Sequence, residues 1–397
     1  MNREDFPILK NKIIYLDSGA TSLKPFYLSE SISDYYNNYS ANAHRGDYGI
    51  SLKVDSMFEN TRKLVADFIN ADNKNSIVFT NNTTDSINKI TYGYFYDYLK
   101  KGDEVLITKS EHASNILPWF ELKDKLGIKV NYIKLDDDHK ITLDNLKDSI
   151  TQDTKVISIA HITNVVGDIR PIKEIVKYAH SLGIKVLVDG AQSVPHIKVD
   201  VKDLDVDFLA FSAHKMCGPT GVGILYVKEE LLKNIKPVFV GGGMNYSFEY
   251  DGTKDYNEMP YLLESGTPNI AGVIGFGAVI NYLNKIGMQN IEEYEKKLRK
   301  YTIDRLKEIP NIKIYNESSE SSIIAFNYDN IFPQDLAIYL DKHNICVRAG
   351  SHCAKILKDE LGIKNTVRIS LYFYNTKDEI DELIKVLKND NILIEAI

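Results

Sequence analysis

Short apolar runs and amphipathic stretches alternate between residues 77 and 227. The apolar runs are IVFT (77–80), EVLI (104–107), VISIA (156–160), VLVD (186–189) and FLAF (208–211). Runs this short, followed by glycine or polar residues, indicate buried strands, and the stretches between them have the apolar spacing of helices. This alternation predicts parallel strands joined by crossover helices, an α/β domain with its functional site at the carboxyl ends of the strands.

The pattern changes towards the C-terminus. A glycine-rich apolar stretch at 266–286 and a charged helix at 290–309 come first, and strands and helices then follow as strand, strand, helix, strand, strand, helix. We therefore expect a large α/β domain of residues 20–265 with a mostly parallel sheet. We expect a smaller α+β domain of residues 266–397, joined by the N-terminal arm of residues 1–19.

The strand predicted at 77–80 leads into NNTTDSIN, where Thr83 or Thr84 stands in the position of a helix N-cap. Free backbone N–H groups and the positive end of the helix dipole make such a terminus a phosphate site. We expect Thr84 to add its hydroxyl to that site, and a plain N-cap is the alternative. A preceding helix is predicted at 56–70.

Lys215 follows the run FLAF at the start of a glycine-rich loop. A lysine that is neutral because of burial and nearby positive charge can attack a carbonyl to form a Schiff base. Asp189 ends the run VLVD, and its carboxylate could keep the ring nitrogen of pyridoxal phosphate (PLP) protonated, while Gln192 could bind the phenolic oxygen. The alternatives are a solvated lysine on a turn and a carboxylate that caps a strand.

Other polar side chains follow the same strands. Ser212 and His214, beside Lys215, could donate hydrogen bonds to a phosphate. His112, in EHASN, could stack on a pyridine ring and move protons, and a structural histidine is the alternative.

Composition limits the class of protein. Hydrophobic residues make up 44% and charged residues 26%, which are ordinary globular values. The net charge of −7 argues against a general nucleic-acid surface, and no apolar run approaches the roughly 18 residues that span a bilayer. The N-terminus lacks the apolar core of a signal peptide, and three cysteines are too few for a disulfide framework, so we expect a cytoplasmic protein. We expect no metal site.

Several segments together resemble the PLP-dependent cysteine desulfurases, in the SufS-type branch of the class-V aminotransferase-like enzymes. The segments are YLDSGATSLKP, AHRG, EHASNILPW, DGAQ, SAHK, GGGM, ESGTPN, RAGSHCA and RISLYFYNT. The resemblance runs from about residue 14 to residue 385 in matching order. It implies the fold-type I, aspartate-aminotransferase-like fold and a homodimer.

The resemblance also implies a role for each matching residue. Lys215 would hold PLP through a Schiff base and then move the α-proton of the substrate, and Arg368 would grip the substrate carboxylate. Thr267, in ESGTPN, would reach the phosphate bound in the partner subunit. The other cofactor contacts implied are those of Thr84, His112, Asn164, Asp189, Gln192, Ser212 and His214, with Asn164 also near the substrate.

Cys353 decides the reaction, because an aminotransferase needs no nucleophilic thiol. The residues around it in RAGSHCA are small or polar, as in an exposed loop. Its thiolate could take the sulfur of L-cysteine as a persulfide and leave alanine. Arg348 is a candidate for the substrate site and could favour the thiolate. We expect Cys217 and Cys346 to be core residues and His352 to be structural.

The short RAGSHCA segment is the part that resembles the SufS-type branch. That branch commonly passes sulfur to an acceptor of the SufE or SufU kind for iron–sulfur cluster assembly, so the resemblance implies such a partner. One alternative is a selenocysteine lyase, because selenium leaves more readily from the same site. A catalytically silent scaffold for sulfur-transfer proteins is the alternative from another class, and it would not need Lys215, Asp189 and Cys353 together.

Overall fold

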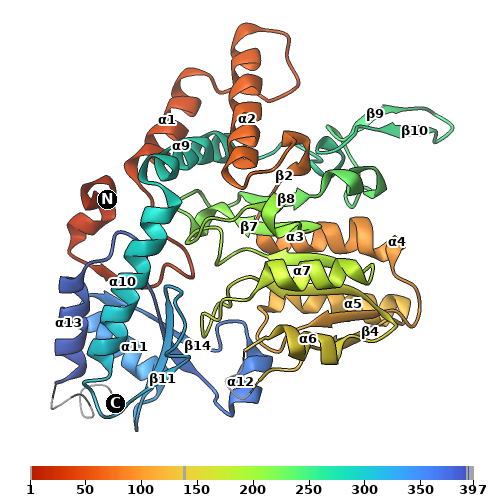
Figure 1. Cartoon of the computed structure of the whole chain (residues 1–397). Helices are drawn as coiled ribbons and strands as arrows, with labels where there is room; N and C mark the ends of the chain where they lie inside the picture. The colour runs from red at the N-terminus through yellow and green to blue at the C-terminus, as the bar shows by residue number, and fades with distance from the viewer. Residues whose placement is uncertain (1, 137–139, 390–391, 393–397) are drawn as a thin grey trace.

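The computed structural model describes residues 2–136, 140–389 and 392, and a seven-stranded sheet forms the middle of its larger part (Figure 1). The strands are β2 (Ile77–Thr80), β3 (Glu104–Ile107), β4 (Lys129–Tyr132), β5 (Thr154–Ala160), β6 (Lys185–Asp189), β7 (Phe208–Ser212) and β8 (Gly223–Val227). Their order is β2-β8-β7-β6-β5-β3-β4. β8 is antiparallel to both of its neighbours, and the other strands run parallel to one another.

The mostly parallel sheet predicted from the sequence is confirmed, and β8 is the exception. Only the loop between Ser212 and Gly223 separates β7 from β8, and it contains no crossover helix. A parallel connection needs a longer crossover, so this loop can only return the chain antiparallel.

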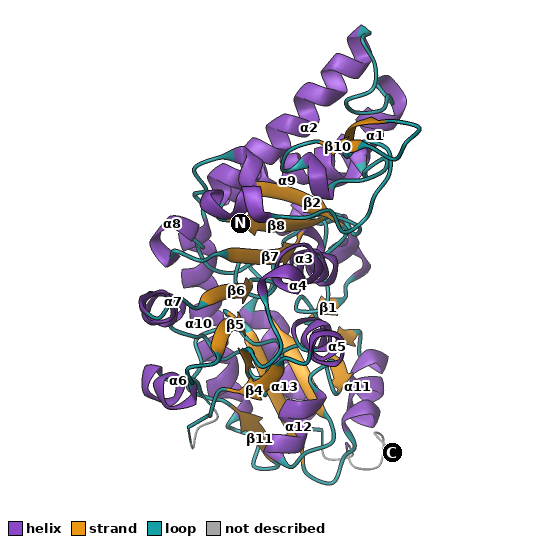
Figure 2. Ribbon diagram, turned by 90° about the vertical axis from the view of Figure 1, so that its right-hand side faces the viewer, coloured by secondary structure: helices purple, strands orange, loops and turns teal. Residues whose placement is uncertain are grey.

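Helices cover both faces of the sheet (Figure 2). On one face lie α3 (Thr83–Ile90), α4 (Tyr96–Tyr98) and α5 (Leu117–Leu126), and on the other lie α6 (Leu143–Ser149), α7 (Ile172–Ser181) and α8 (Val201–Leu204). Side chains alternate between the faces along each strand. In β6, Val186 and Val188 join the core under α7, whereas Leu187 joins the core under α3 and α5. Burial on both faces explains why these strands are continuous apolar runs.

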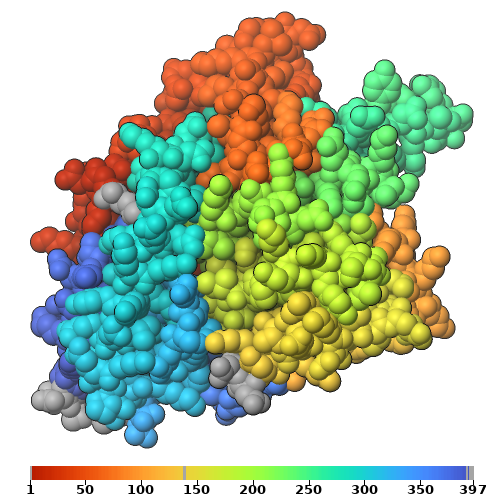
Figure 3. Space-filling model, in the orientation of Figure 1, coloured from red at the N-terminus to blue at the C-terminus, as the bar shows by residue number. Residues whose placement is uncertain are grey.

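Three helices extend the molecule beyond the sheet: α1 (Phe26–Asn38), α2 (Gly49–Phe68) and α9 (Ile270–Ile286), with α9 in contact with both of the others (Figure 1). α2 starts at Gly49, before the start at residue 56 that the apolar spacing predicts. A hairpin of β9 (Asn245–Phe248) and β10 (Lys254–Tyr256) projects from the body, as Figure 3 also shows. Tyr246, Phe248 and Tyr250 on this hairpin are exposed.

The C-terminal part contains a four-stranded antiparallel sheet in the order β11-β12-β15-β14. Its elements are α10 (Met288–Leu306), β11 (Ile312–Tyr315), β12 (Ile323–Tyr328), α11 (Pro333–Lys342), β13 (Ile345–Cys346), β14 (Arg348–Gly350), α12 (Lys355–Leu361), β15 (Thr366–Ser370) and α13 (Lys377–Leu387). β1 (Ile14–Tyr15) pairs with β13, so the N-terminal arm lies with this part of the chain. The domain boundaries at residues 19 and 265 stay a prediction.

Short helical turns complete the described structure. They are Arg3–Asp5, Pro7–Asn11, Lys74–Ser76, Ala113–Asn115, Ala213–Lys215, Glu229–Asn234 and Tyr261–Leu263, together with a π-helical turn at Thr91–Phe95. No single helix among the described residues is both long and apolar enough to cross a membrane. α9 and α10 pass that test only as a pair, and they are bent by 71° where they meet.

Candidate active site

A cavity of about 260 Å³ opens at the carboxyl ends of β5, β6 and β7. Parallel strands of a doubly wound sheet bind ligands at this edge. The predicted site residues that line it are Thr84, His112, Asn164, Asp189, Gln192, Ser212, His214, Lys215, Arg348 and Arg368. Gly19, Ala20, Asn82, Thr83, Ser114 and His352 also line it. The structure thus brings most of the predicted residues together from segments far apart in the sequence.

Lys215 ends the helical turn that follows β7. The N-terminal loop holds this turn, because the His214 carbonyl accepts hydrogen bonds from Ser22 N (3.0 Å), Thr21 Oγ1 (3.0 Å) and Lys24 Nζ (2.7 Å). Burial lowers the pKa of the Lys215 ammonium to about 8. The Asp189 carboxylate opposes that shift. At pH 7 the ammonium form still predominates, but the neutral, nucleophilic amine is far more accessible than in an ordinary lysine.

Asp189 lies at the end of β6, where burial raises the pKa of its carboxyl group to about 6. The backbone N–H of Ala191 donates to it at 2.9 Å. A cationic ring nitrogen placed here would favour the carboxylate. Nearby, Gln192 Oε1 and Asn164 Oδ1 are buried at the cavity without a hydrogen-bond partner among the described residues. Orphaned polar atoms of this kind indicate room for a polar ligand.

The N-terminus of α3 faces the same cavity. The N-cap is Asn82, whose side chain accepts from Asp85 N at 2.9 Å, so the prediction of Thr83 or Thr84 as the cap is wrong. At the N-cap position asparagine is preferred over threonine. The Thr83 hydroxyl instead lies 2.6 Å from Ser212 Oγ, and Thr84 Oγ1 lies 2.6 Å from Ser114 Oγ. Hydroxyls and a helix N-terminus together fit a phosphate.

His112 is neutral in this setting. The backbone N–H of Ser114 donates to His112 Nδ1 at 3.1 Å, so the ring proton is on Nε2. Burial, with the nearby charges of Lys215, Arg348 and Arg368, lowers the pKa of this ring to about 4. A neutral imidazole can stack against an aromatic ring without the cost of burying a charge.

Two arginines mark the other side of the cavity. Arg348 and Arg368 are opposite each other in the antiparallel pair of β14 and β15, although like charges in that position are unfavourable. Arg368 Nη2 donates to Asp17 at 2.8 Å and Nη1 donates to the Asn164 carbonyl at 2.9 Å, and burial lowers its pKa. Two guanidinium groups with one carboxylate leave an excess of positive charge, which favours an anionic substrate group.

Cys353, the predicted nucleophile, is exposed and is not among the residues that line this cavity, but the residue before it, His352, does line it. Both residues have positive φ, 52° for His352 and 56° for Cys353, as in type I′ turns. Ala354 N closes the turn onto the Ser351 carbonyl at 3.0 Å. We call residues 351–354 the thiol turn. The backbone N–H of Ala113 donates to the Cys353 carbonyl at 2.9 Å, so the thiol turn is connected to the segment that carries His112.

Three further predictions have mixed outcomes. Cys217 is fully buried as predicted, whereas Cys346 is only half-buried. His352 was expected to be structural. It is buried, but it also lines the cavity. Its position directly before Cys353 was the feature of the sequence that could have indicated a place in the site. Among the described residues no group of three or more histidine, cysteine or acidic side chains could hold a metal ion.

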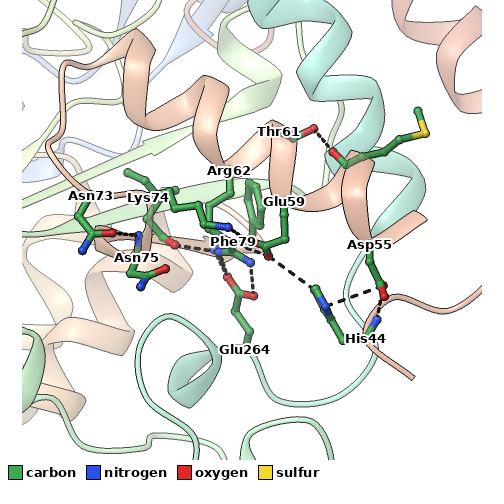
Figure 4. A network of polar contacts seen from close by, with 12 residues as sticks. His44, Asp55, Glu59, Thr61, Arg62, Asn73, Lys74, Asn75, Phe79 and Glu264 are labelled. Carbon is green, nitrogen blue, oxygen red and sulfur yellow. Dashed lines mark hydrogen bonds and ion pairs between the residues drawn. The ribbon is translucent and has the colours of Figure 1, made fainter. Parts of the chain in front are cut away.

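Thr267 does not line the main cavity. It lines a separate space of about 120 Å³ with Glu264 and Lys89. Figure 4 shows how its loop is anchored: the guanidinium of buried Arg62 donates to both Glu264 oxygens, at 2.6 and 2.9 Å, and its Nε donates to Glu59 at 3.2 Å. A position outside this chain's own cavity is compatible with the predicted contact to a partner subunit.

The sequence matches the family model described as aminotransferase class-V over residues 14–383. The chain is 42% identical to a probable cysteine desulfurase of Halalkalibacterium halodurans, with 96% of this chain and 95% of the relative covered. The solved apo structure of a cysteine desulfurase from Thermococcus onnurineus NA1 superposes with a TM-score of 0.93 at 40% identity, covering 97% of this chain and 96% of that one. The crystal structure of the cysteine desulfurase CsdA (S-sulfonic acid) from Escherichia coli superposes with a TM-score of 0.92 at 35% identity, covering 97% of this chain and 96% of that one. The chain belongs to the class-V aminotransferase family and, within it, to the cysteine desulfurases.

Proposed function

We propose that this enzyme binds pyridoxal phosphate in the cavity and converts L-cysteine and the Cys353 thiol into L-alanine and a Cys353 persulfide. The proposal rests mainly on one arrangement: Lys215 and Asp189 line one buried cavity, and the exposed Cys353 directly follows His352, which lines the same cavity. The reaction balances without an outside oxidant, because the C–S bond of the substrate breaks as the S–S bond forms.

The cofactor would be held at three points. The N-terminus of α3 with Thr84, Ser212 and His214 would bind its phosphate, His112 would stack on its ring, and Asp189 would pair with its ring nitrogen. Gln192 and Asn164 would satisfy their unpartnered amide oxygens near its polar edge. Bound PLP supplies an electron sink for the charge left on the substrate when its Cα–H bond breaks.

The remaining steps belong to side chains of this chain. Arg368, with Arg348, would bind the substrate carboxylate. Lys215, with its lowered pKa, would take the proton from the substrate Cα. Two protons then go to carbon, one to the carbon that becomes the alanine methyl group and one back to Cα. The second of these is the thiol proton released when the S–S bond forms. The Cys353 thiolate would attack the substrate sulfur, and its exposure leaves the resulting persulfide open to an acceptor.

We also infer the wider setting. The short cysteine loop favours the SufS-type branch, with a SufE- or SufU-type protein as acceptor and iron–sulfur assembly as the use of the sulfur. A homodimer would complete the site by placing Thr267 at the phosphate bound in the partner subunit. The exposed aromatic side chains of the β9–β10 hairpin are of the kind that an interface buries. Three free cysteines suit a reducing cytoplasm.

Two variants test the proposal. Lys215→Ala should lose the absorbance of the covalently bound cofactor and at least about 100-fold in alanine formation, because the amine is removed. Cys353→Ala should keep the absorbance and lose turnover of L-cysteine with a reductant as sulfur acceptor. A Cys353→Ala enzyme that still desulfurates L-cysteine at the wild-type rate would refute the persulfide step. Comparing kcat/KM for cysteine and selenocysteine in both enzymes separates desulfurase from selenocysteine lyase.

A further inference from the structure

Lys358 is a buried cation without an acidic partner among the described residues. It lies on α12 with 2% of its surface exposed, and its Nζ donates to Thr366 Oγ1 at 2.6 Å. Burying an ammonium group against one neutral hydroxyl is costly, and an apolar side chain of similar length would avoid that cost. The neighbouring Lys355 shows the usual state of a lysine on this helix, with 86% of its side chain exposed and a contact to Asp359 at 3.4 Å.

A chain of hydrogen bonds leads from Lys358 to the thiol turn. Thr366 Oγ1 lies 3.0 Å from His352 Nε2, and the Thr366 carbonyl lies 3.1 Å from the same nitrogen. The His352 carbonyl in turn accepts from Asn164 Nδ2 at 2.7 Å. His352 is 4% exposed, and the next residue is Cys353. The turn is therefore held on the cavity side by Asn164 and on the side of β15 by Thr366.

Lys358 fixes the acceptor in that second contact. The Thr366 carbonyl can only accept, so His352 Nε2 carries the ring proton and donates to the carbonyl and to Thr366 Oγ1. A protonated lysine can only donate, so Thr366 Oγ1 accepts from Lys358 as well, and the lysine holds this oxygen in place for His352. Without Lys358 the hydroxyl can rotate, and the ring of His352 keeps only the carbonyl as a fixed acceptor. This matters because His352 and Cys353 both have positive φ, a backbone state that persists only where its surroundings enforce it.

We propose that Lys358 is a positioning residue for sulfur transfer: through Thr366 and His352 it holds the turn that carries the Cys353 sulfur. This inference rests on the proposed function, in which Cys353 receives the substrate sulfur. Lys358 touches neither substrate nor cofactor and acts only through the turn.

The test replaces Lys358 with methionine in the PLP-loaded enzyme, with Lys355→Met as the matched control on the same helix. We expect Lys358→Met to lower kcat for L-cysteine at least fivefold while KM and the cofactor absorbance stay within twofold of wild type. Its melting temperature should rise, because a buried charge is gone. A purely structural lysine would not give lower kcat together with higher stability. An unchanged kcat would overturn the proposal.

Thr366 provides a second test if the methionine variant fails to fold. Thr366→Ser keeps the hydroxyl and should keep wild-type kcat, whereas Thr366→Val should lose as much as Lys358→Met. The double variant Lys358→Met/Thr366→Val should lose no more than either alone, because both break the same chain of contacts. If the fold losses in kcat of the two single variants multiply in the double variant, Lys358 acts elsewhere, and the proposal is overturned.

Hydrogen exchange separates this inference from the proposed function. In Lys358→Met, the backbone amides of residues 351–354 should exchange at least fivefold faster than in wild type, with no change in Lys355→Met. If wild-type enzyme forms no alanine from L-cysteine, the proposed function fails, and the exchange rates still decide whether Lys358 holds the turn. Equal exchange rates would overturn the positioning role whatever the activity.

Discussion

Single residues in the site occupy states that the rest of the fold has to stabilise. The positive φ of His352 and Cys353 costs about 1–3 kcal/mol for each residue. Burial without an acidic partner adds to this at Lys358, and Arg348 and Arg368 face each other across two strands. Costs of this kind concentrated around one exposed thiol are typical of a site shaped for chemistry.

The stability effect of Lys358→Met should depend on pH. Burial lowers the pKa of the Lys358 ammonium from 10.5 to about 8, so between these values the unfolded wild-type chain binds more protons than the folded one. Wild-type stability therefore rises from pH 8 to 10.5, and the methionine variant lacks that rise. We expect the variant to be more stable by about 1–3 kcal/mol below pH 8. Urea denaturation at pH 7 and pH 9.5 checks this, and an advantage that does not shrink at pH 9.5 would contradict it.

The sequence analysis placed Lys215 and Asp189 at strand ends, and the structure brings both to one cavity. Asp189 ends one clear apolar run, and Lys215 lies in the turn that follows another. Their roles stay a prediction. The sequence could not predict Lys358. Spacing along the segment KILKDEL gives no reason to separate Lys358 from Lys355. Only the folded chain shows that Lys358 is buried and reaches Thr366 on β15, whereas Lys355 is exposed. The thiol turn was likewise foreseen as a loop but not as two successive residues with positive φ.

At the scale of elements, the close approach of β8 to the start of α3 shapes the end of the cavity where we propose that the phosphate binds. A Cβ added at Gly223 would lie 2.5 Å from the Cα of Asn82 and 2.5 Å from Thr80 Oγ1. Glycine is needed at the start of β8 so that the N-cap of α3 can sit against the sheet.

Gly223→Ala should therefore push the start of α3 away from the sheet. We expect a loss of about 1–3 kcal/mol in the free energy of unfolding, because the clash is with backbone. We also expect weaker PLP binding, measured by absorbance titration. Gly49→Ala, at the start of α2 where an added Cβ meets nothing within 4 Å, is the control and should change neither quantity. Equal PLP affinity in Gly223→Ala would mean that the α3 terminus does not hold the phosphate.

Elements were predicted best where an apolar run is buried on both faces. The strands β2, β3, β5, β6 and β7 are examples, since their runs stand out from the helices between them. Element ends were harder to predict. α2 begins earlier than predicted, at Gly49, and Ile50 and Leu52 in its first turn are exposed, so they do not belong to the buried apolar face of the helix. Asn82 rather than a threonine caps α3. The antiparallel direction of β8 follows from the short loop between β7 and β8. The length of that loop could have been read from the sequence.

At the scale of the whole molecule, buried Arg62 joins α2, β2 and the loop before α9 (Figure 4). Besides Glu264, it donates to the Ile77 carbonyl at 2.8 Å, and Glu264 also accepts from Phe79 N at 2.7 Å. The same loop carries Thr267, so this ion pair connects the core of one subunit to the predicted contact with its partner.

Arg62→Met should destabilise the protein by about 3–5 kcal/mol, because it leaves the Glu264 carboxylate buried without its partner. Lys63→Met is the control: Lys63 and Asp67 form an exposed pair at 2.5 Å and should contribute less than about 1 kcal/mol. Chemical denaturation gives both values. If the two variants lose equal stability, the buried pair does not anchor this loop.

The most direct test of the account follows the sulfur atom in a single turnover. The PLP-loaded enzyme is mixed with substoichiometric L-cysteine without reductant. The amount of alanine is then measured, and the mass of the peptide that contains Cys353 is determined by mass spectrometry. The account predicts one alanine for each Cys353 that gains the mass of one sulfur atom, with Cys217 and Cys346 unchanged. Alanine released while Cys353 stays unmodified, or sulfur found on another cysteine, would contradict it.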